Sequence, residues 1–158
     1  MSTEHLTDAG DRRWPIAGRV ALITGAAKRL GHALALELAG RGACVAAHYA
    51  SSRDTAENLA RDIREGGGVC EIFQADFDRP ESARELLARV SETMGPVSIL
   101  INNASIFHEQ TFTGMSLEEL ERNLRVNAFA PLEAARAMAA ASSDGVILNL
   151  LDTRVLDY

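Results

Sequence analysis

Short, continuous apolar runs alternate along this chain with longer segments in which apolar residues recur every three or four positions. The short runs are typical of strands that are buried on both faces of a parallel sheet, and the spaced segments are typical of helices. Repeated strand and helix alternation predicts a doubly wound α/β fold with a parallel sheet. Strands are expected at 19–24, 43–48, 69–74, 97–102 and 146–151, and helices at 29–41, 53–65, 80–94 and 116–141.

Several helix ends carry recognisable signals. Glycines 66–68 suit a helix carboxyl end followed by a loop. Pro80 fits the first turn of the third helix, with Asp78 as its expected cap. Ser116 followed by Glu119 fits a capping box, so the fourth helix is expected to begin there.

Length and charge narrow the class of protein. A chain of 158 residues fits one domain, which we place at 18–158 after a loosely packed tail at 1–17. The net charge of -6 argues against nucleic-acid binding, and no apolar run approaches a membrane span. The polar amino-terminal segment lacks a signal core, so a cytoplasmic location is expected. Cys44 and Cys70 are interpreted as buried, reduced thiols.

A glycine turn follows the first strand directly and opens the first helix. Gly25 tolerates backbone angles that are closed to other residues, and Gly31 lets the helix pack close to the strand. The amino end of that helix presents N–H groups and a partial positive charge to an anion. This context predicts a dinucleotide-phosphate site, with an ordinary strand-to-helix turn as the alternative.

The turn, Thr-Gly-x-x-x-Arg-Leu-Gly, resembles the cofactor turn of the short-chain dehydrogenase/reductases. Arginine in place of the common glycine resembles the pteridine reductase branch of that family. The resemblance covers 19–152 and implies a Rossmann fold, with five of about seven strands present. Arg29 is expected to pair with phosphate oxygens or to face the substrate. The cofactor residues implied in the turn are Gly25, Lys28, Arg29, Leu30 and Gly31.

The end of the second strand predicts which nicotinamide cofactor is bound. An NAD site usually has Asp or Glu at this strand end. Residues 48–53 include neither, and the first acidic residue after the strand is Asp54. The hydroxyl, imidazole and guanidinium groups of these residues suit the extra phosphate of NADP instead, and a solvated helix start is the alternative. The pteridine reductases have a similar stretch with arginine where Ser51 stands, so Arg53 is expected to substitute. The candidate NADP residues are His48, Tyr49, Ser51, Ser52 and Arg53.

The next two strand ends match further family motifs. By resemblance, Asp76 binds the adenine amino group and Phe77 lines the adenine pocket. The stretch Asn102-Asn103-Ala104-Ser105 resembles the family's NNAG motif, with Ser105 in place of glycine. Asn103, Ala104 and Ser105 are therefore expected at the cofactor, and Ser105 also at the substrate. Phe107 is the candidate platform for a flat heteroaromatic substrate, with a core phenylalanine as the alternative.

Two further residues are candidates for proton transfer. Pro131 has no N–H to pair with the carbonyl of Asn127, so that carbonyl is available to hold a water, as the family's matching asparagine does. A kink braced by Asn127 is the alternative. Asp152 matches an aspartate of the pteridine reductases, and a buried acid there is suited to protonate a ring nitrogen. A polar strand-end residue is the alternative for Asp152.

The family's tyrosine and lysine pair is expected about a dozen residues after Asp152, and Tyr158 is too close to be that tyrosine. We therefore expect a carboxyl-terminally truncated enzyme, inactive alone, whose fifth strand is an unpaired edge. The function predicted is NADPH-dependent reduction of a pteridine or similar heterocyclic or carbonyl small molecule, with no metal. A full-length form is expected to be a homo-oligomer. The alternatives are a ketone or alcohol dehydrogenase of the same family and a non-catalytic NADP-binding module.

Overall fold

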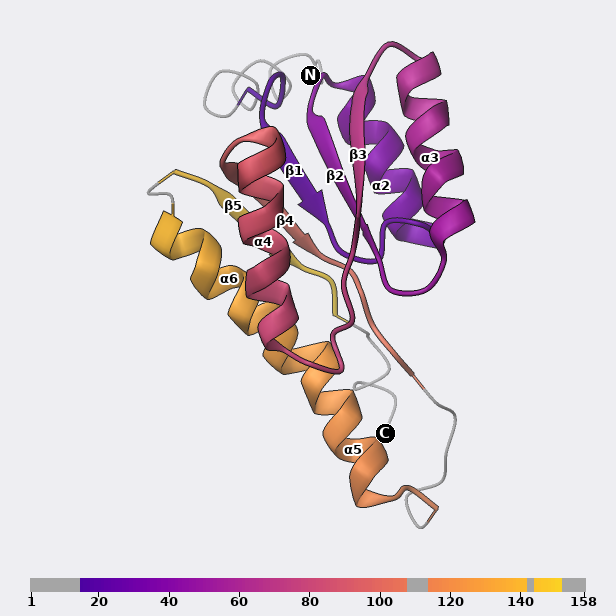
Figure 1. Cartoon of the computed structure of the whole chain (residues 1–158), viewed down its shortest axis with the longest axis vertical. Coiled ribbons are helices and arrows are strands. Elements are labelled where there is room, and N and C mark those ends of the chain that lie inside the picture. Colours follow the sequence, from indigo (N-terminus) through magenta and orange to yellow (C-terminus); the bar gives the residue numbers. More distant parts are fainter. Residues whose placement is uncertain (1–14, 108–113, 142–143, 152–158) are drawn as a thin grey trace, which may run out of the picture.

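The computed structural model describes residues 15–107, 114–141 and 144–151. Within these ranges the chain forms one parallel sheet in the order β3-β2-β1-β4-β5, with helices on both faces (Figure 1). The predicted doubly wound α/β fold is confirmed. The strands are β1 (Val20–Ile23), β2 (Cys44–Tyr49), β3 (Val69–Gln74), β4 (Val97–Asn102) and β5 (Val146–Asn149). The helices are α2 (Arg29–Gly40), α3 (Arg53–Glu65), α4 (Glu81–Met94), α5 (Leu117–Leu124), η2 (Arg125–Phe129) and α6 (Ala130–Ala141).

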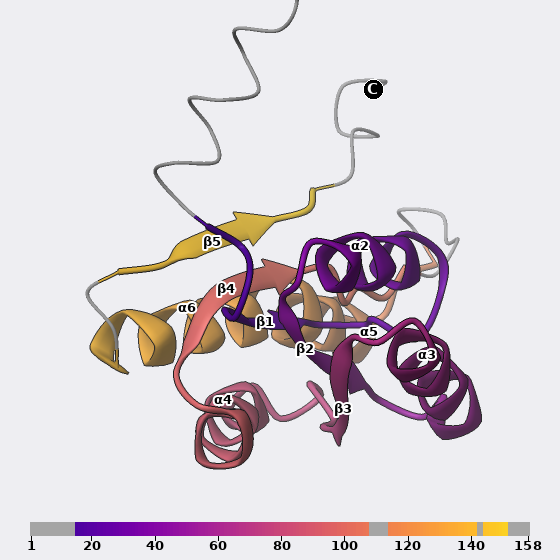
Figure 2. The same ribbon diagram turned by 90° about the horizontal axis from the view of Figure 1, so that it is seen from above.

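Successive residues of the central strands face opposite sides of the sheet, so each strand contributes to two separate cores. Leu22 packs with α4 and α6, and its neighbour Ile23 packs with α2 and α3. Figure 2 shows the helices distributed on the two sides of the sheet. Both faces are covered, which explains why the central strands read as continuous apolar runs.

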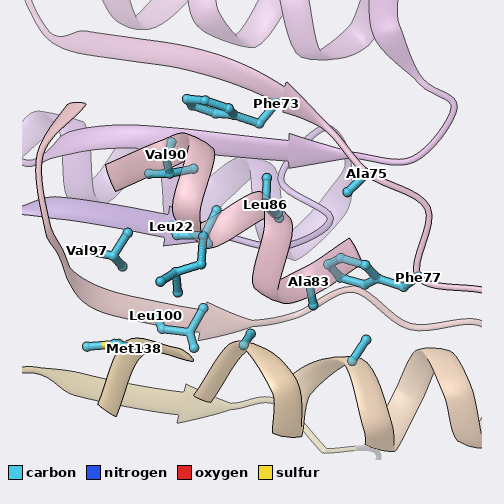
Figure 3. Packing of buried hydrophobic residues seen from close by; sticks show 14 of the residues in the cluster. Leu22, Phe73, Ala75, Phe77, Ala83, Leu86, Val90, Val97, Leu100 and Met138 are labelled. Carbon is cyan, nitrogen blue, oxygen red and sulfur yellow. The ribbon is translucent and has the colours of Figure 1, made fainter. Parts of the chain in front are cut away.

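The larger core lies between the sheet and the helices α4 and α6 (Figure 3). Leu86 and Val90 of α4 point toward Leu22 and Leu100 of the sheet, and all four side chains are buried. Met138 of α6 closes the same cluster. This packing fixes α6 against β4 and so positions the loops that follow the strands.

The two outermost strands differ in their exposure. In β3 buried residues lie between exposed ones, whereas every residue of β5 is exposed. Val146, Ile147 and Leu148 are 39–44% exposed, and β5 is the end strand among the described residues. In the described structure the fifth strand is therefore an apolar edge, as predicted.

The predicted helix ends are confirmed with one correction. Ser116 caps α5 in a full capping box with Glu119, and Gly66 caps α3. Asp78 does not cap α4, because Pro80 holds that position without a side-chain bond. The Asp78 carboxylate instead accepts two hydrogen bonds from Nε of Arg122, at 2.9 and 3.0 Å. The nearby guanidinium offers this carboxylate a charged partner that the helix end does not.

The helix predicted at 116–141 contains a widened turn. Residues Arg125–Phe129 form a π-helical turn between α5 and α6, and Pro131 is the second residue of α6. In a regular α-helix the ring of Pro131 would clash with the carbonyl of Asn127, and a wider turn relieves that clash. The insertion of this turn places Asn127 at the site described next.

Candidate functional site

The carboxyl ends of β1 and β4 are tied together at Thr24. The Thr24 hydroxyl accepts the backbone N–H groups of Asn103 and Ala104, at 3.0 and 2.9 Å. The Asn103 side chain donates in return to the carbonyls of Thr24 and Gly25, at 2.9 and 3.1 Å. Thr24 is buried, so these bonds hold the glycine turn rigidly against the strand-end loop. Sequence reasoning assigned Asn103 to the cofactor and gave Thr24 no role.

Both turn glycines are required by the space around them. Gly25 has a φ of +65°, and a Cβ there would lie 3.0 Å from the Cα of Ala104. A Cβ on Gly31 would lie 2.6 Å from Nδ2 of Asn103, which no real side chain tolerates. The two positions therefore allow β1, β4 and the start of α2 to approach each other closely.

The amino end of α2 is prepared for an anion. Its N-cap is Lys28, which makes no side-chain capping bond, and its first turn has no acidic residue. The other described α-helices, α3, α4, α5 and α6, each have an acidic residue in the first turn. An acidic side chain would repel a phosphate from the N–H groups and dipole of α2.

Arg29, the first residue of α2, has a φ of +52°, and it is the one described residue other than glycine with a positive φ. This left-handed conformation costs an ordinary side chain about 1–2 kcal/mol. Glycine would adopt it without strain. The strain is therefore a reason to expect that the Arg29 side chain has a function.

A cavity of about 400 Å³ lies in front of the turn. It brings together residues from the ends of β1, β2, β3 and β4, as the carboxyl edge of a parallel sheet does for ligands. Asp76 and Phe77 line it together with the turn. The predicted residues that line it are Gly25, Lys28, Arg29, Leu30, His48, Asp76, Phe77, Asn103, Ala104 and Ser105.

The two predicted residues at the end of β2 are buried. Tyr49 packs with Ala27 and Ala56 away from the cavity. His48 is 2% exposed, and both its ring nitrogens make hydrogen bonds within the protein. Burial lowers the pKa of His48 to about 4, although its bond to the Ala75 carbonyl opposes the shift. His48 is therefore neutral at physiological pH and brings no charge to a phosphate.

The other three candidate NADP residues, Ser51, Ser52 and Arg53, lie nearer solvent. Ser51 and Arg53 are exposed, and the hydroxyl of Ser52 makes no capping bond to α3. Nε of Arg53 donates to the Glu57 carboxylate at 2.7 Å. A phosphate at this position would compete with Glu57 for the guanidinium. None of these residues lines the described cavities, and Gly31 and Tyr49 also lie outside the linings.

A second cavity of about 790 Å³ adjoins the first and shares Ala104, Ser105 and Ile106 with it. Phe107 lines this cavity and is 62% exposed, so it is not a core residue. The remaining wall comes from the ends of β4 and β5, from α6 and from the widened turn. The structure thus brings Ser105, Phe107 and Asn127 together.

Asn127 fastens the loop between the two cavities. Its side chain accepts the Ile106 N–H at 2.9 Å and donates to the Ile106 carbonyl at 2.8 Å. It also donates to the Asn123 side chain at 2.6 Å. Asn127 therefore holds the loop at Ile106 against the helix, and its part in proton transfer stays a prediction. Asp152, the other proton-transfer candidate, lies outside the described residues.

Sequence reasoning missed Arg122 and Val126, which line the first cavity one helical turn apart. Their spacing of four residues places them on one helix face. This spacing is the sequence feature from which their shared position could have been inferred. Within the described ranges, no three His, Cys, Asp or Glu side chains gather as a metal site. None of the helices that the structure describes is long and apolar enough to span a membrane.

The fold and this site define a class. A match to the short chain dehydrogenase family covers residues 19–151, and the chain belongs to that family. It is 37% identical over 127 residues to versicolorin reductase 1 of Aspergillus parasiticus, a match covering 80% of this chain and 45% of that protein. It is 31% identical to the 3-oxoacyl-[acyl-carrier-protein] reductase FabG of Staphylococcus epidermidis, covering 82% of this chain and 54% of that one. The chain thus spans about half the length of these relatives.

Solved structures of similar proteins include cofactor complexes. FolM alternative dihydrofolate reductase 1 from Brucella canis, solved with NADP, superposes with a TM-score of 0.84 at 33% identity, covering 90% of this chain and 58% of that one. A blue fluorescent protein from a metagenomic library, solved with NADPH, has a TM-score of 0.81 at 32% identity, with coverages of 86% and 56%.

Proposed function

We propose that this chain carries the NADP(H) site of a short-chain oxidoreductase. The observation that carries the proposal is the anion-ready start of α2, where an acid-free first turn and Lys28 face a cavity at the strand ends. Lys28 is the only lysine of the chain. Similar proteins solved with NADP and NADPH support the same cofactor.

Each part of the first cavity has a proposed role toward the dinucleotide. The α2 N–H groups, Lys28 and Arg29 bind the pyrophosphate. Asp76 accepts from the adenine amino group, and Phe77 provides an apolar wall for the ring. Ser51, Ser52 and Arg53 lie outside the lining and follow Ala50, which lines the cavity, and they are proposed to receive the 2′-phosphate that distinguishes NADP from NAD. When bound, the nicotinamide supplies a hydride for transfer to a substrate.

The second cavity is the proposed substrate site. Phe107 offers an exposed aromatic face to a flat heterocycle, and Ser105 lies where the two cavities meet. A pteridine or a similar heterocyclic or carbonyl compound fits these groups, and the likeness to a FolM dihydrofolate reductase favours this class. Asp152 is the proposed proton donor to a ring nitrogen.

The cofactor proposal is tested by titrating the protein with NADPH and NADH while following nucleotide fluorescence. NADPH is expected to bind at least about tenfold more tightly, because a 2′-phosphate gains charge-assisted hydrogen bonds worth about 1.4 kcal/mol or more. Arg53→Ala should reduce this preference. Arg61→Ala, which removes an exposed arginine from the same helix, should leave it unchanged. Equal affinity for the two nucleotides would contradict the proposal.

The substrate proposal is tested by NADPH oxidation with a dihydropteridine and with simple ketones, using the chain extended to the full length of its relatives, because the 158 residues alone are expected to be inactive. Faster turnover of the dihydropteridine, lost in Phe107→Ala, supports the pteridine-like assignment. Turnover of ketones alone would indicate a general short-chain dehydrogenase. If this longer enzyme binds NADPH and turns over neither class, a non-catalytic module is favoured and the reductase assignment is contradicted.

A further inference from the structure

His48 lies at the end of β2, where the cofactor turn and the adenine wall meet. Its Nδ1 atom lies 3.0 Å from the backbone nitrogen of Gly25, the first glycine of the turn. Its Nε2 atom lies 3.1 Å from the carbonyl oxygen of Ala75, the residue before Asp76. One side chain therefore contacts both parts of the first cavity.

The two hydrogen bonds fix the protonation of the ring. The Gly25 N–H is a donor, so Nδ1 accepts and carries no proton. Nε2 consequently carries the proton and donates to Ala75. A protonated imidazolium has no acceptor and would lose the bond to Gly25. The neutral Nε2–H form is thus the one that satisfies both neighbours.

The ring also supports the adenine wall directly. His48 stacks on Phe77 with the ring centroids 4.4 Å apart and the planes at 12°. Figure 3 shows Ala75 and Phe77 at the same end of the buried cluster, beside the amino end of α4. His48 is itself buried, so its orientation is set by these contacts.

We propose that His48 is a positioning residue for the dinucleotide, which fixes Gly25 through one ring nitrogen and the Ala75–Phe77 segment through the other. His48 acts by holding the backbone of Gly25 and Ala75. The sequence instead predicts a direct contact between His48 and the cofactor phosphate. This inference rests on the proposed function, because that proposal identifies the ligand as NADP(H). The consequence is that the pyrophosphate turn and the adenine wall are held in one fixed relation before the cofactor binds, which lowers the cost of binding.

Three substitutions separate the two bonds. His48→Asn places an amide oxygen near the Nδ1 position and retains an acceptor for Gly25. His48→Gln places an amide nitrogen near the Nε2 position and retains a donor for Ala75. His48→Phe retains an aromatic ring against Phe77 and loses both bonds. The Asn and Gln variants both lose the ring, so each is the matched control for the other.

NADPH affinity and thermal midpoint are measured for all three variants. We expect His48→Phe, which loses both bonds, to bind NADPH about tenfold more weakly than the parent. His48→Asn and His48→Gln lose one bond each, so their affinities should lie between those two, although both lose the ring that packs on Phe77. A purely structural role predicts instead that affinity follows the thermal midpoint across the three variants, and that result would overturn the inference. His32→Asn, on α2, should change neither quantity.

Amide hydrogen exchange without any ligand gives an independent readout. Gly25 N–H is expected to exchange slowly in the parent and in His48→Asn, and faster in His48→Gln and His48→Phe. Equal Gly25 exchange in the Asn and Gln variants would overturn the inference whether or not the protein binds a nucleotide. If exchange differs as expected but the parent binds no nicotinamide dinucleotide, the proposed function fails, and with it the effect on affinity.

Discussion

At the residue scale, Arg29 shows a conflict between stability and chemistry. Its φ of +52° is one that glycine adopts freely, yet the chain places a guanidinium there beside the first cavity. Backbone strain of this kind persists where the surrounding structure enforces it, and it gathers at functional sites. The side chain at this position is therefore expected to contribute to ligand binding rather than to folding.

Arg29→Gly is predicted to raise the free energy of unfolding by about 0.5–1 kcal/mol, because relief of strain exceeds the entropy that glycine adds to the unfolded chain. The same variant should bind NADPH more weakly, since a phosphate partner is lost. Chemical denaturation and nucleotide titration measure the two effects. Arg41→Gly, at the other end of α2 with a φ of −90°, should gain no stability and should keep its affinity. Loss of stability in Arg29→Gly would contradict this account.

His48 predicts a pH dependence of stability. Its pKa is lowered from 6.5 to about 4 in the folded protein, chiefly by burial. Below pH 6.5 the unfolded chain takes up a proton that the folded ring does not, so stability is full above pH 6.5 and falls as the pH drops toward 4. The loss reaches about 3 kcal/mol. Denaturation of the parent and of His48→Phe across this range isolates the effect from the carboxylates, and parallel curves would contradict it.

At the element scale, the amphipathic helix α5 depends on its cap. No residue of α5 is buried, so packing contributes little and the capping box with Glu119 carries more of the stability of this helix. Ser116→Ala is predicted to lower the free energy of unfolding by about 1 kcal/mol. Ser91→Ala, within α4, serves as the control and should have a smaller effect. Helix content and denaturation midpoints measure the difference.

The helices and strands were predictable because a sheet that is buried on both faces requires continuous apolar strands between amphipathic helices. Strands β3 and β4 match the predicted ranges, and β1 and β5 are shorter than predicted. The widened turn at Arg125–Phe129 was not predicted, because the sequence there reads as a continuous helix and only Pro131 disturbs it. The side chain of Asn127, on this turn, is hydrogen-bonded to the backbone of Ile106, which is distant in sequence, so this contact could not be inferred from the helix pattern.

The candidate site was predictable where the backbone determines it, as at Gly25 and Gly31. The site was less predictable where the direction of a side chain decides which partner it contacts. A histidine near the end of a strand can bind a phosphate or can join two parts of the protein from a buried position, and the structure gives His48 two internal partners. Arg122 was missed because its partner, Asp78, lies 44 residues away and looked like a helix cap.

At the scale of the whole molecule, the turn that carries Lys28 and Arg29 is positively charged, whereas the chain as a whole is negatively charged. The net charge of -6 repels a dinucleotide phosphate at long range, and Lys28 and Arg29 attract it only at the turn. Binding therefore depends on local geometry, which the Thr24 and His48 contacts hold in place. The second cavity opens beside this turn, so a ligand of the first cavity lies next to a ligand of the second.

The central claim is tested most directly by a crystal structure of the chain with NADP⁺. We predict that the pyrophosphate lies at the amino end of α2 beside Lys28 and Arg29. The adenine should lie against Phe77, and the nicotinamide should point toward the second cavity. A dinucleotide bound elsewhere on the chain, or a first cavity empty at saturating NADP⁺, would contradict the account.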